Sequence, residues 1–166
     1  HELQLGAEPA NAGRAGFFKL RQIDHQARVH QQIDFDAVFR FGRQIAQHVL
    51  KLGYRVVVTS RDPGDVQDLA EHGDALILKL DVTDRSQAEK AVKAAEDHYG
   101  GIDVLVNNAG IGYFAAVEES DEKEVRKMFD VNVFGLCRMI HLVLPGMRKR
   151  RKGYIVNLSS IAGLRS

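Results

Sequence analysis

The chain has 166 residues, of which 45% are hydrophobic and 27% charged, and its formal net charge is +1. These values are typical of one globular domain, and so small a net charge gives no reason to expect binding to nucleic acid or to a membrane surface. No continuous apolar run reaches the roughly 18 residues that a membrane span needs, and the single cysteine excludes an internal disulfide and predicts a reducing, cytoplasmic setting.

The first segment, residues 1–40, differs in composition from the rest of the chain. It is rich in Gln, Ala, Arg and His and lacks sustained periodicity. Val29–Asp34 is a poor candidate for a buried strand, although the alternation of apolar residues from Ile33 to Phe39 suggests a substitute strand. We therefore expect a boundary near residue 40.

From there on, apolar periodicity and capping residues predict a regular alternation of elements. In chain order these are a helix over 43–52, a strand over 54–59, a short helix over 65–72, a strand over 75–80, a helix from the cap Asp84 to about Tyr99, a strand over 102–106, a long helix over 121–148 and a strand over 154–158. Strands that alternate with helices indicate right-handed βαβ units and a parallel sheet.

Small and polar blocks follow two of these strands, and a third polar position lies on the long helix. Asn107–Gly110 reads Asn-Asn-Ala-Gly, Asn132 lies on the helix, and Ile155–Ser160 ends in two serines. Ligands of open α/β sheets bind beyond the carboxyl ends of the strands, so these blocks predict a binding site.

Together these blocks resemble the short-chain dehydrogenase/reductase family of Rossmann-type NAD(P)(H)-dependent oxidoreductases. The similarity covers residues 41–166, about the first two-thirds of a family member. It implies an α/β fold with a Rossmann-like, doubly wound parallel sheet that is incomplete, because the first strand is atypical and the last strands are absent. Residues 41–166 would then be a partial dinucleotide-binding domain, and residues 1–40 are not expected to be the family's native opening.

The resemblance also implies roles for single residues. Asn132 and Ser160 match the family's catalytic Asn and Ser, although a polar helix residue and an ordinary turn are the plainer interpretations. The positions matched to cofactor-binding residues are Gly42, Asp81 with the following Val82, Asn107, Ala109 and Gly110. Gly42 matches the last glycine of the family's phosphate loop. Phe35, Asp36 and Arg40 stand where that loop has Thr and two glycines.

The residues after the strand over 54–59 favour NADP(H) over NAD(H). Ser60 stands where an NAD-preferring protein has a carboxylate for the ribose hydroxyl, and Arg61 follows it. A guanidinium binds a 2′-phosphate through two charge-assisted bonds, whereas a carboxylate would repel it. The alternative is that Arg61 is a solvated surface residue.

The family's proton-donating Tyr-x-x-x-Lys motif is absent, because none of the four tyrosines is followed four residues later by lysine. Intact relatives are expected to transfer hydride between NADP(H) and a carbonyl or secondary alcohol, and this chain alone is expected to be inactive. Two alternatives stay open. One is a non-catalytic Rossmann-like module that binds a nucleotide or a partner, and the other is a gene-prediction artefact without a stable fold.

The remaining candidates favour structural interpretations. The histidines lack metal-ligand spacing, so no metal site is predicted. Cys137 is expected to be a small core residue. The basic run Arg148–Lys152 is expected to be a solvated helix end that complements the helix dipole. By the resemblance, a homo-oligomer would form through the long helix 121–148.

Overall fold

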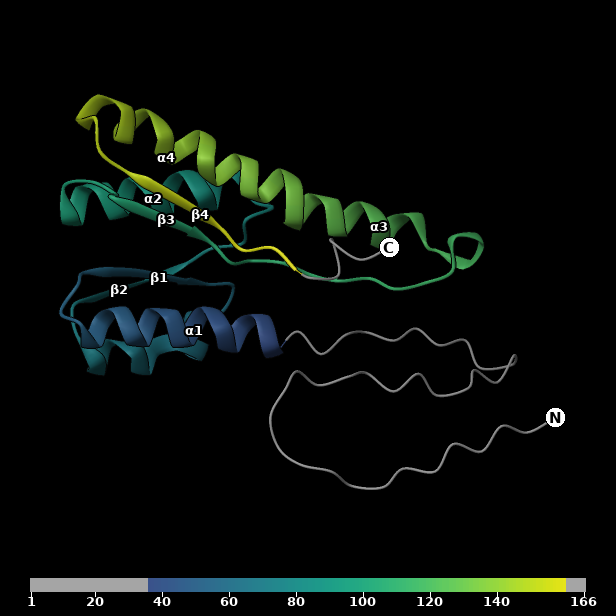
Figure 1. Ribbon diagram of the computed structural model, residues 1–166, viewed down its shortest axis with the longest axis horizontal. Coiled ribbons are helices and arrows are strands. Elements are labelled where there is room, and N and C mark those ends of the chain that lie inside the picture. Colours follow the sequence, from purple (N-terminus) through teal and green to yellow (C-terminus); the bar gives the residue numbers. More distant parts are fainter. Residues whose placement is uncertain (1–35, 161–166) are drawn as a thin grey trace, which may run out of the picture.

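A computed structural model describes residues 36–160 of the chain (Figure 1). The elements in order are α1 (Asp36–Lys51), β1 (Val56–Ser60), the 3₁₀ helix η1 (Pro63–His72), β2 (Ala75–Lys79), α2 (Arg85–Tyr99), β3 (Val104–Asn107), the short 3₁₀ helix η2 (Val117–Glu119), α3 (Glu122–Phe129), the π-helical segment η3 (Asp130–Gly135), α4 (Leu136–Arg150) and β4 (Tyr154–Asn157). Every strand and helix predicted after residue 42 is present.

The start of α1 differs from the prediction. The helix begins at Asp36 rather than Arg43, so Asp36 and Arg40 belong to a helix and not to a phosphate loop. The substitute strand predicted up to Phe39 is therefore wrong from Asp36 onward, where the chain is helical. Apolar residues at 38, 41, 45 and 49 already have the spacing of one face of a helix. Phe35 and the candidate strand Val29–Asp34 lie outside the described residues.

The strands confirm the parallel α/β class, but they form two pairs rather than the single sheet that was expected. β1 pairs with β2 and β3 pairs with β4, both parallel, which gives two separate two-stranded sheets. Within residues 36–160 no strand joins β1 to β3.

Helices cover both faces of the strands, which is the doubly wound arrangement (Figure 1). On one side, α2 and α4 pack through Ala88, Val92, Met139 and Val143 against partly buried residues of β2, β3 and β4. On the other side, α1 and η1 pack through Leu50 and other buried residues against β1 and β2. In β2, Ala75 and Ile77 pack in the second cluster and their neighbour Leu78 packs in the first, on opposite faces as the alternation of a strand requires.

In the part of the chain that the structure describes, one face of the β3–β4 pair is exposed. Leu105 and Ile155 point toward α4 and the core. Their strand neighbours point the other way, and Val104 is 51% exposed, Val106 39% and Val156 45%. An apolar strand face of this kind normally requires a covering layer.

Tyr99, at the end of α2, ties the β3–β4 half of the molecule to the β1–β2 half. Its hydroxyl donates to Asp74 Oδ1 at 2.8 Å, and the Arg55 guanidinium lies 5.3 Å from its ring centre. Burial, and then the hydrogen bond to Asp74, raise the pKa of Tyr99 from 10.0 to about 12.

We expect this link to make the fold sensitive to alkali. The neutral phenol is favoured in the folded state, so its contribution to stability is complete below pH 10.0 and is lost as the pH approaches about 12. The ultraviolet absorbance of phenolate is measured against pH for the native chain and for Tyr99→Phe. The difference between the two curves is the titration of Tyr99. A Tyr99 transition at the ordinary pKa would contradict the structure.

The long helix from Glu122 to Arg150 is long and apolar enough to cross a membrane by length and composition alone. Within the fold it packs on α2 and β3 through Met139, Val143 and Met147. The π-helical segment η3 interrupts it at Asn132, and such segments often occur at functional sites.

Candidate functional site

The carboxyl ends of β3 and β4 lie side by side and carry a pair of asparagines. Asn107 and Asn157 are register partners, and Asn107 Nδ2 donates to Asn157 Oδ1 at 2.8 Å. The Asn107 carbonyl also accepts a hydrogen bond from the Leu158 amide at 3.0 Å. Asn107 is 9% exposed, so its polar groups need these partners, and the pair fixes the two loops that leave the sheet.

Asn132 holds the loop after β3 through two hydrogen bonds. Its Oδ1 accepts from the Ile111 amide at 2.8 Å, and its Nδ2 donates to the Ile111 carbonyl at 2.7 Å. A side-chain amide that pairs with both backbone groups of one residue imitates a strand partner. The loop carrying Asn108–Gly110 is therefore attached to the long helix at its π-helical segment.

Small residues leave open space in this loop. A Cβ at Gly110 would lie 3.5 Å from Asn132 Oδ1, which is ordinary contact, and Ala109 is exposed. Gly42 is different, because a Cβ there would lie 2.5 Å from Asn108 Nδ2. Gly42 thus lets α1 pack closely against the loop, and it does so from within a helix.

The turn after β1 presents a free cation. Ser60 ends the strand, and its hydroxyl accepts from the Asp62 amide at 3.3 Å. Asp62 caps η1 by accepting from the Gly64 amide at 2.9 Å. Arg61, between them, is exposed and forms no ion pair within residues 36–160. Its guanidinium is therefore available to an anion.

The turn after β2 is held from both sides. Asp81 Oδ1 accepts from the amide of Thr83 at 2.9 Å and from its hydroxyl at 2.7 Å. The Val82 carbonyl accepts from Arg138 of α4. Gly135 faces Val82, and a Cβ at Gly135 would lie 2.7 Å from Val82 Cγ2. The long helix thus positions the loop after β2 as well as the loop after β3.

The structure brings the carboxyl ends of β3, β4 and the Asn132 segment to one edge, which we call the carboxyl edge. Ser160 is exposed and lies in the coil that follows β4 at this edge.

The sequence did not indicate that Asn157, Ile111 and Arg138 position the site. Only Asn157 gave a usable sign, because it stands at the end of a strand just as Asn107 does.

Two other expectations can be compared with the structure. Cys137 is exposed, so its assignment to the core is wrong: the apolar face of α4 turns Met139 and Val143 inward instead. No group of three His, Cys, Asp or Glu side chains in the described part of the chain could hold a metal ion.

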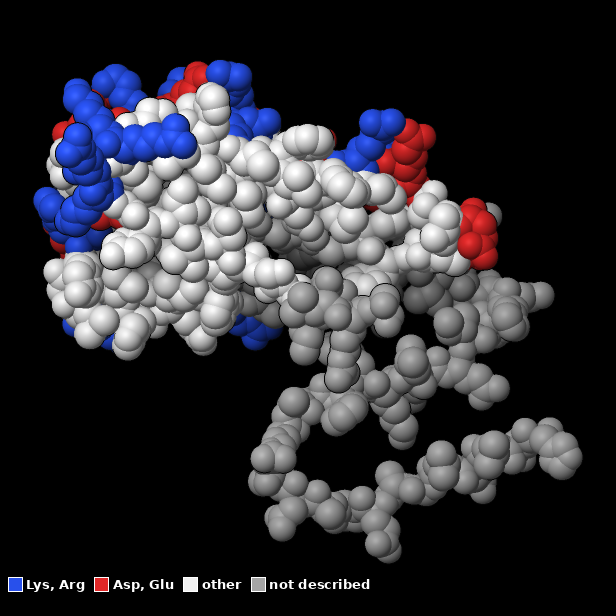
Figure 2. Space-filling view, turned by 45° about the horizontal axis from the view of Figure 1, so that its top comes forward, with Lys and Arg blue, Asp and Glu red and all other residues white. Residues whose placement is uncertain are grey.

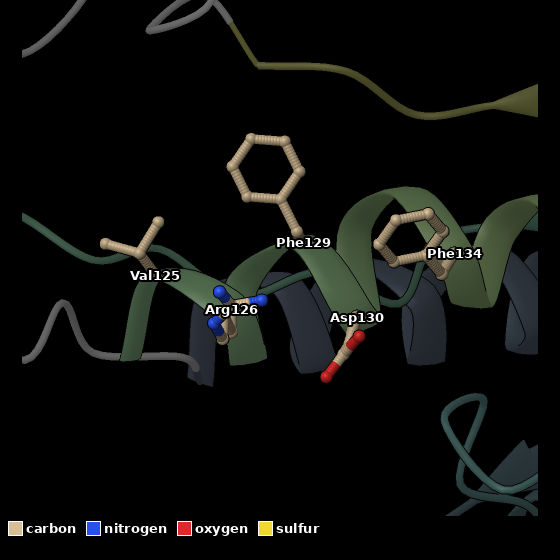
Figure 3. A pocket seen from close by; sticks show the side chains of 5 residues that line it. All are labelled: Val125, Arg126, Phe129, Asp130 and Phe134. Atoms are coloured by element: carbon tan, nitrogen blue, oxygen red, sulfur yellow. The ribbon is translucent and has the colours of Figure 1, made fainter. Parts of the chain in front are cut away.

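A shallow hollow lies on the surface of α3 and η3, and Figure 3 shows the side chains that line it. It is lined by Val125, Arg126, Phe129, Asp130 and Phe134, of which Phe129 is 48% and Phe134 56% exposed. None of these residues is among those predicted to bind a cofactor. This face belongs to the long helix through which oligomerisation is predicted.

The chemistry available at the carboxyl edge is that of binding rather than of acid–base catalysis. It offers amide groups, a hydroxyl and a loop of small residues whose backbone a flat or charged ligand can approach closely. The Arg61 guanidinium lies at the carboxyl end of β1, in the other pair of strands. These groups fit a dinucleotide.

Comparison with known proteins gives consistent matches. A family model for short chain dehydrogenase matches residues 40–166. The chain is 40% identical over 124 residues to the 3-ketodihydrosphingosine reductase of Bacteroides thetaiotaomicron, covering 75% of this chain and 44% of that protein. It is 39% identical over 123 residues to retinol dehydrogenase 8 of Homo sapiens, covering 70% of this chain and 39% of that protein. The chain thus spans less than half the length of either relative.

Solved structures agree. A short-chain dehydrogenase from Streptomyces avermitilis matches with a TM-score of 0.72 and 40% identity, over 76% of this chain and 47% of that one. ElxO with NADP bound matches with a TM-score of 0.70 and 33% identity, over 75% of this chain and 53% of that one.

Proposed function

The chain belongs to the short-chain dehydrogenase family, and from this premise we propose that it binds NADP(H) at its carboxyl edge. We further propose that the whole protein transfers hydride between this cofactor and a lipophilic carbonyl or secondary alcohol. The observation that carries the proposal is the double hydrogen bond from Asn132 to Ile111, which fixes the small-residue loop beside Asn107.

The preference for NADP(H) rests on the turn after β1. Ser60 supplies no carboxylate to hold a ribose hydroxyl, and the exposed Arg61 offers two parallel donors for a 2′-phosphate. ElxO, a structural neighbour, has NADP bound. The names of the two relatives above, a sphingoid-base reductase and a retinol dehydrogenase, support a lipophilic substrate.

The roles of the chain's own residues follow from their positions. Asn107, Ala109 and Gly110 line the approach of the cofactor, which supplies the hydride when bound. The Ser160 hydroxyl donates a hydrogen bond to the substrate oxygen as negative charge develops there. Asn132 acts as a positioning residue through Ile111. A proton donor for the oxygen is not supplied by residues 1–166, because Tyr54, Tyr99, Tyr113 and Tyr154 lack the following lysine.

We therefore expect these 166 residues to bind NADPH without oxidising it. The test is NADPH absorbance over time with purified chain and a panel of lipophilic ketones and aldehydes, with a calorimetric titration on the same sample. Binding without turnover is the predicted result. Turnover above the protein-free background would contradict the assignment of the proton donor to the missing motif.

One observation favours a second function. The uncovered valines Val104, Val106 and Val156 form an apolar strand face that a partner could cover. A non-catalytic, partner-binding module would use this face. A cooperative melt without nucleotide binding would favour this alternative.

A further inference from the structure

Cations gather at the end of the molecule opposite the carboxyl edge. Arg55 precedes β1, and five consecutive basic residues close α4 and lead into β4. Figure 2 shows a mainly blue area, with some red, at the end of the molecule where α4 ends. We call this group the basic end; its members are Arg55, Arg148, Lys149, Arg150, Arg151 and Lys152.

The two parts of the basic end meet around one carboxylate. Lys152 Nζ lies 3.0 Å from Asp103 Oδ2, and Arg150 Nη2 donates to the Ile102 carbonyl at 2.6 Å. The hydrogen bond to Lys152, with the nearby charges of Lys152, Arg150 and Arg55, lowers the pKa of Asp103. The carboxylate therefore lies among cations from both halves of the fold.

Three of the cations are exposed and unneutralised. Within residues 36–160, Arg148, Lys149 and Arg151 form no ion pair, although all three are exposed. The backbone at this helix end is capped, because Arg151 takes the left-handed conformation with φ 53° and its amide donates to the Arg148 and Met147 carbonyls. Cations in the last turn complement the helix dipole, but that effect does not require the run to continue beyond the helix to Lys152.

Large apolar side chains project from the same end. Leu52 is 61% exposed, Tyr54 63% and Tyr154 73%. Leu52 and Tyr54 lie between α1 and β1, next to Arg55 in the sequence, and Tyr154 begins β4 one residue after the basic run. Tyrosine prefers the interface between water and lipid, where its ring is buried and its hydroxyl is solvated.

We propose that the basic end docks on the surface of an anionic lipid bilayer. Lipid phosphates and carboxylates neutralise the unpaired cations, while Leu52, Tyr54 and Tyr154 enter the headgroup region. A nucleic acid would satisfy the cations but would give no partner to Leu52. Docking in this way leaves the carboxyl edge open to its cofactor.

The test is co-sedimentation of the chain with vesicles of phosphatidylcholine alone or mixed with phosphatidylserine. Each surface cation contributes about fivefold to binding an anionic membrane, so the triple variant R148A/K149A/R151A is expected to bind about 100-fold more weakly. The matched control removes three exposed lysines elsewhere, at Lys79, Lys90 and Lys123, and is expected to bind like the native chain.

High salt is expected to release the bound chain, and Tyr154→Ser is expected to weaken binding without changing its salt dependence. Equal binding to both vesicle types, or equal loss in the control variant, would overturn the proposal. Tighter binding to single-stranded RNA than to the vesicles would also overturn it and would assign the basic end to nucleic acid. The triple variant is also titrated with NADPH. This measurement distinguishes a failure of the membrane proposal from a failure of the proposed function.

Discussion

Asn132→Leu is expected to lower the free energy of unfolding by about 2–4 kcal/mol. Leucine has a similar size but leaves the Ile111 amide and carbonyl without their partners, which lie 2.8 and 2.7 Å from the native side chain. Each partly buried backbone group that loses its partner costs about 1–3 kcal/mol, and some access to water reduces the sum. Chemical denaturation followed by circular dichroism measures the change.

The same substitution is expected to raise the NADPH dissociation constant about tenfold or more, because the loop of Asn108–Gly110 loses its attachment to the long helix. Val133→Leu, at an exposed neighbouring position, is the matched control and is expected to change stability by less than about 0.5 kcal/mol. If Asn132→Leu leaves both stability and NADPH affinity unchanged, the two hydrogen bonds between Asn132 and Ile111 have no role at the site.

Arg61→Glu is expected to weaken NADPH binding about 100-fold and to leave NADH binding nearly unchanged. Charge-assisted hydrogen bonds contribute about 1.5–3 kcal/mol, and the new carboxylate also repels the 2′-phosphate. The side chain is exposed and unpaired in the described structure, so the fold should tolerate its replacement. Isothermal titration calorimetry with each nucleotide measures the selectivity.

Two further variants sharpen this prediction. Arg61→Lys keeps the charge but not the paired donors, and we expect intermediate affinity for NADPH. Arg85→Glu reverses the charge of another exposed arginine, at the start of α2, and should not change selectivity. If Arg61→Glu lost affinity for both nucleotides, Arg61 would support the fold and would not bind the 2′-phosphate of NADPH.

The elements could be predicted from the sequence because each carries its own local pattern. Asp84 caps α2 by accepting from the Gln87 amide at 3.0 Å, and Gly100 ends the helix in the left-handed conformation, as their residue types indicate. The start of α1 was missed because the family resemblance favoured a loop there over the helical spacing of residues 38–49.

The site was only partly predictable. The positions of Asn107 and Asn132 were visible, but their partners were not, because the bonds to Asn157 and Ile111 join residues 50 and 21 positions apart. Such contacts depend on how the strands pair and on where the long helix crosses the loop. The exposure of Cys137 has the same origin, since the sequence of α4 does not say which part of its apolar surface is covered.

The most direct test is calorimetric titration of residues 1–166 with NADPH and NADH, together with a thermal melt of the same sample. We expect a cooperative melt and saturable binding that is at least about tenfold tighter for NADPH than for NADH. A cooperative melt with no binding of either nucleotide would contradict it, and so would the absence of any cooperative transition.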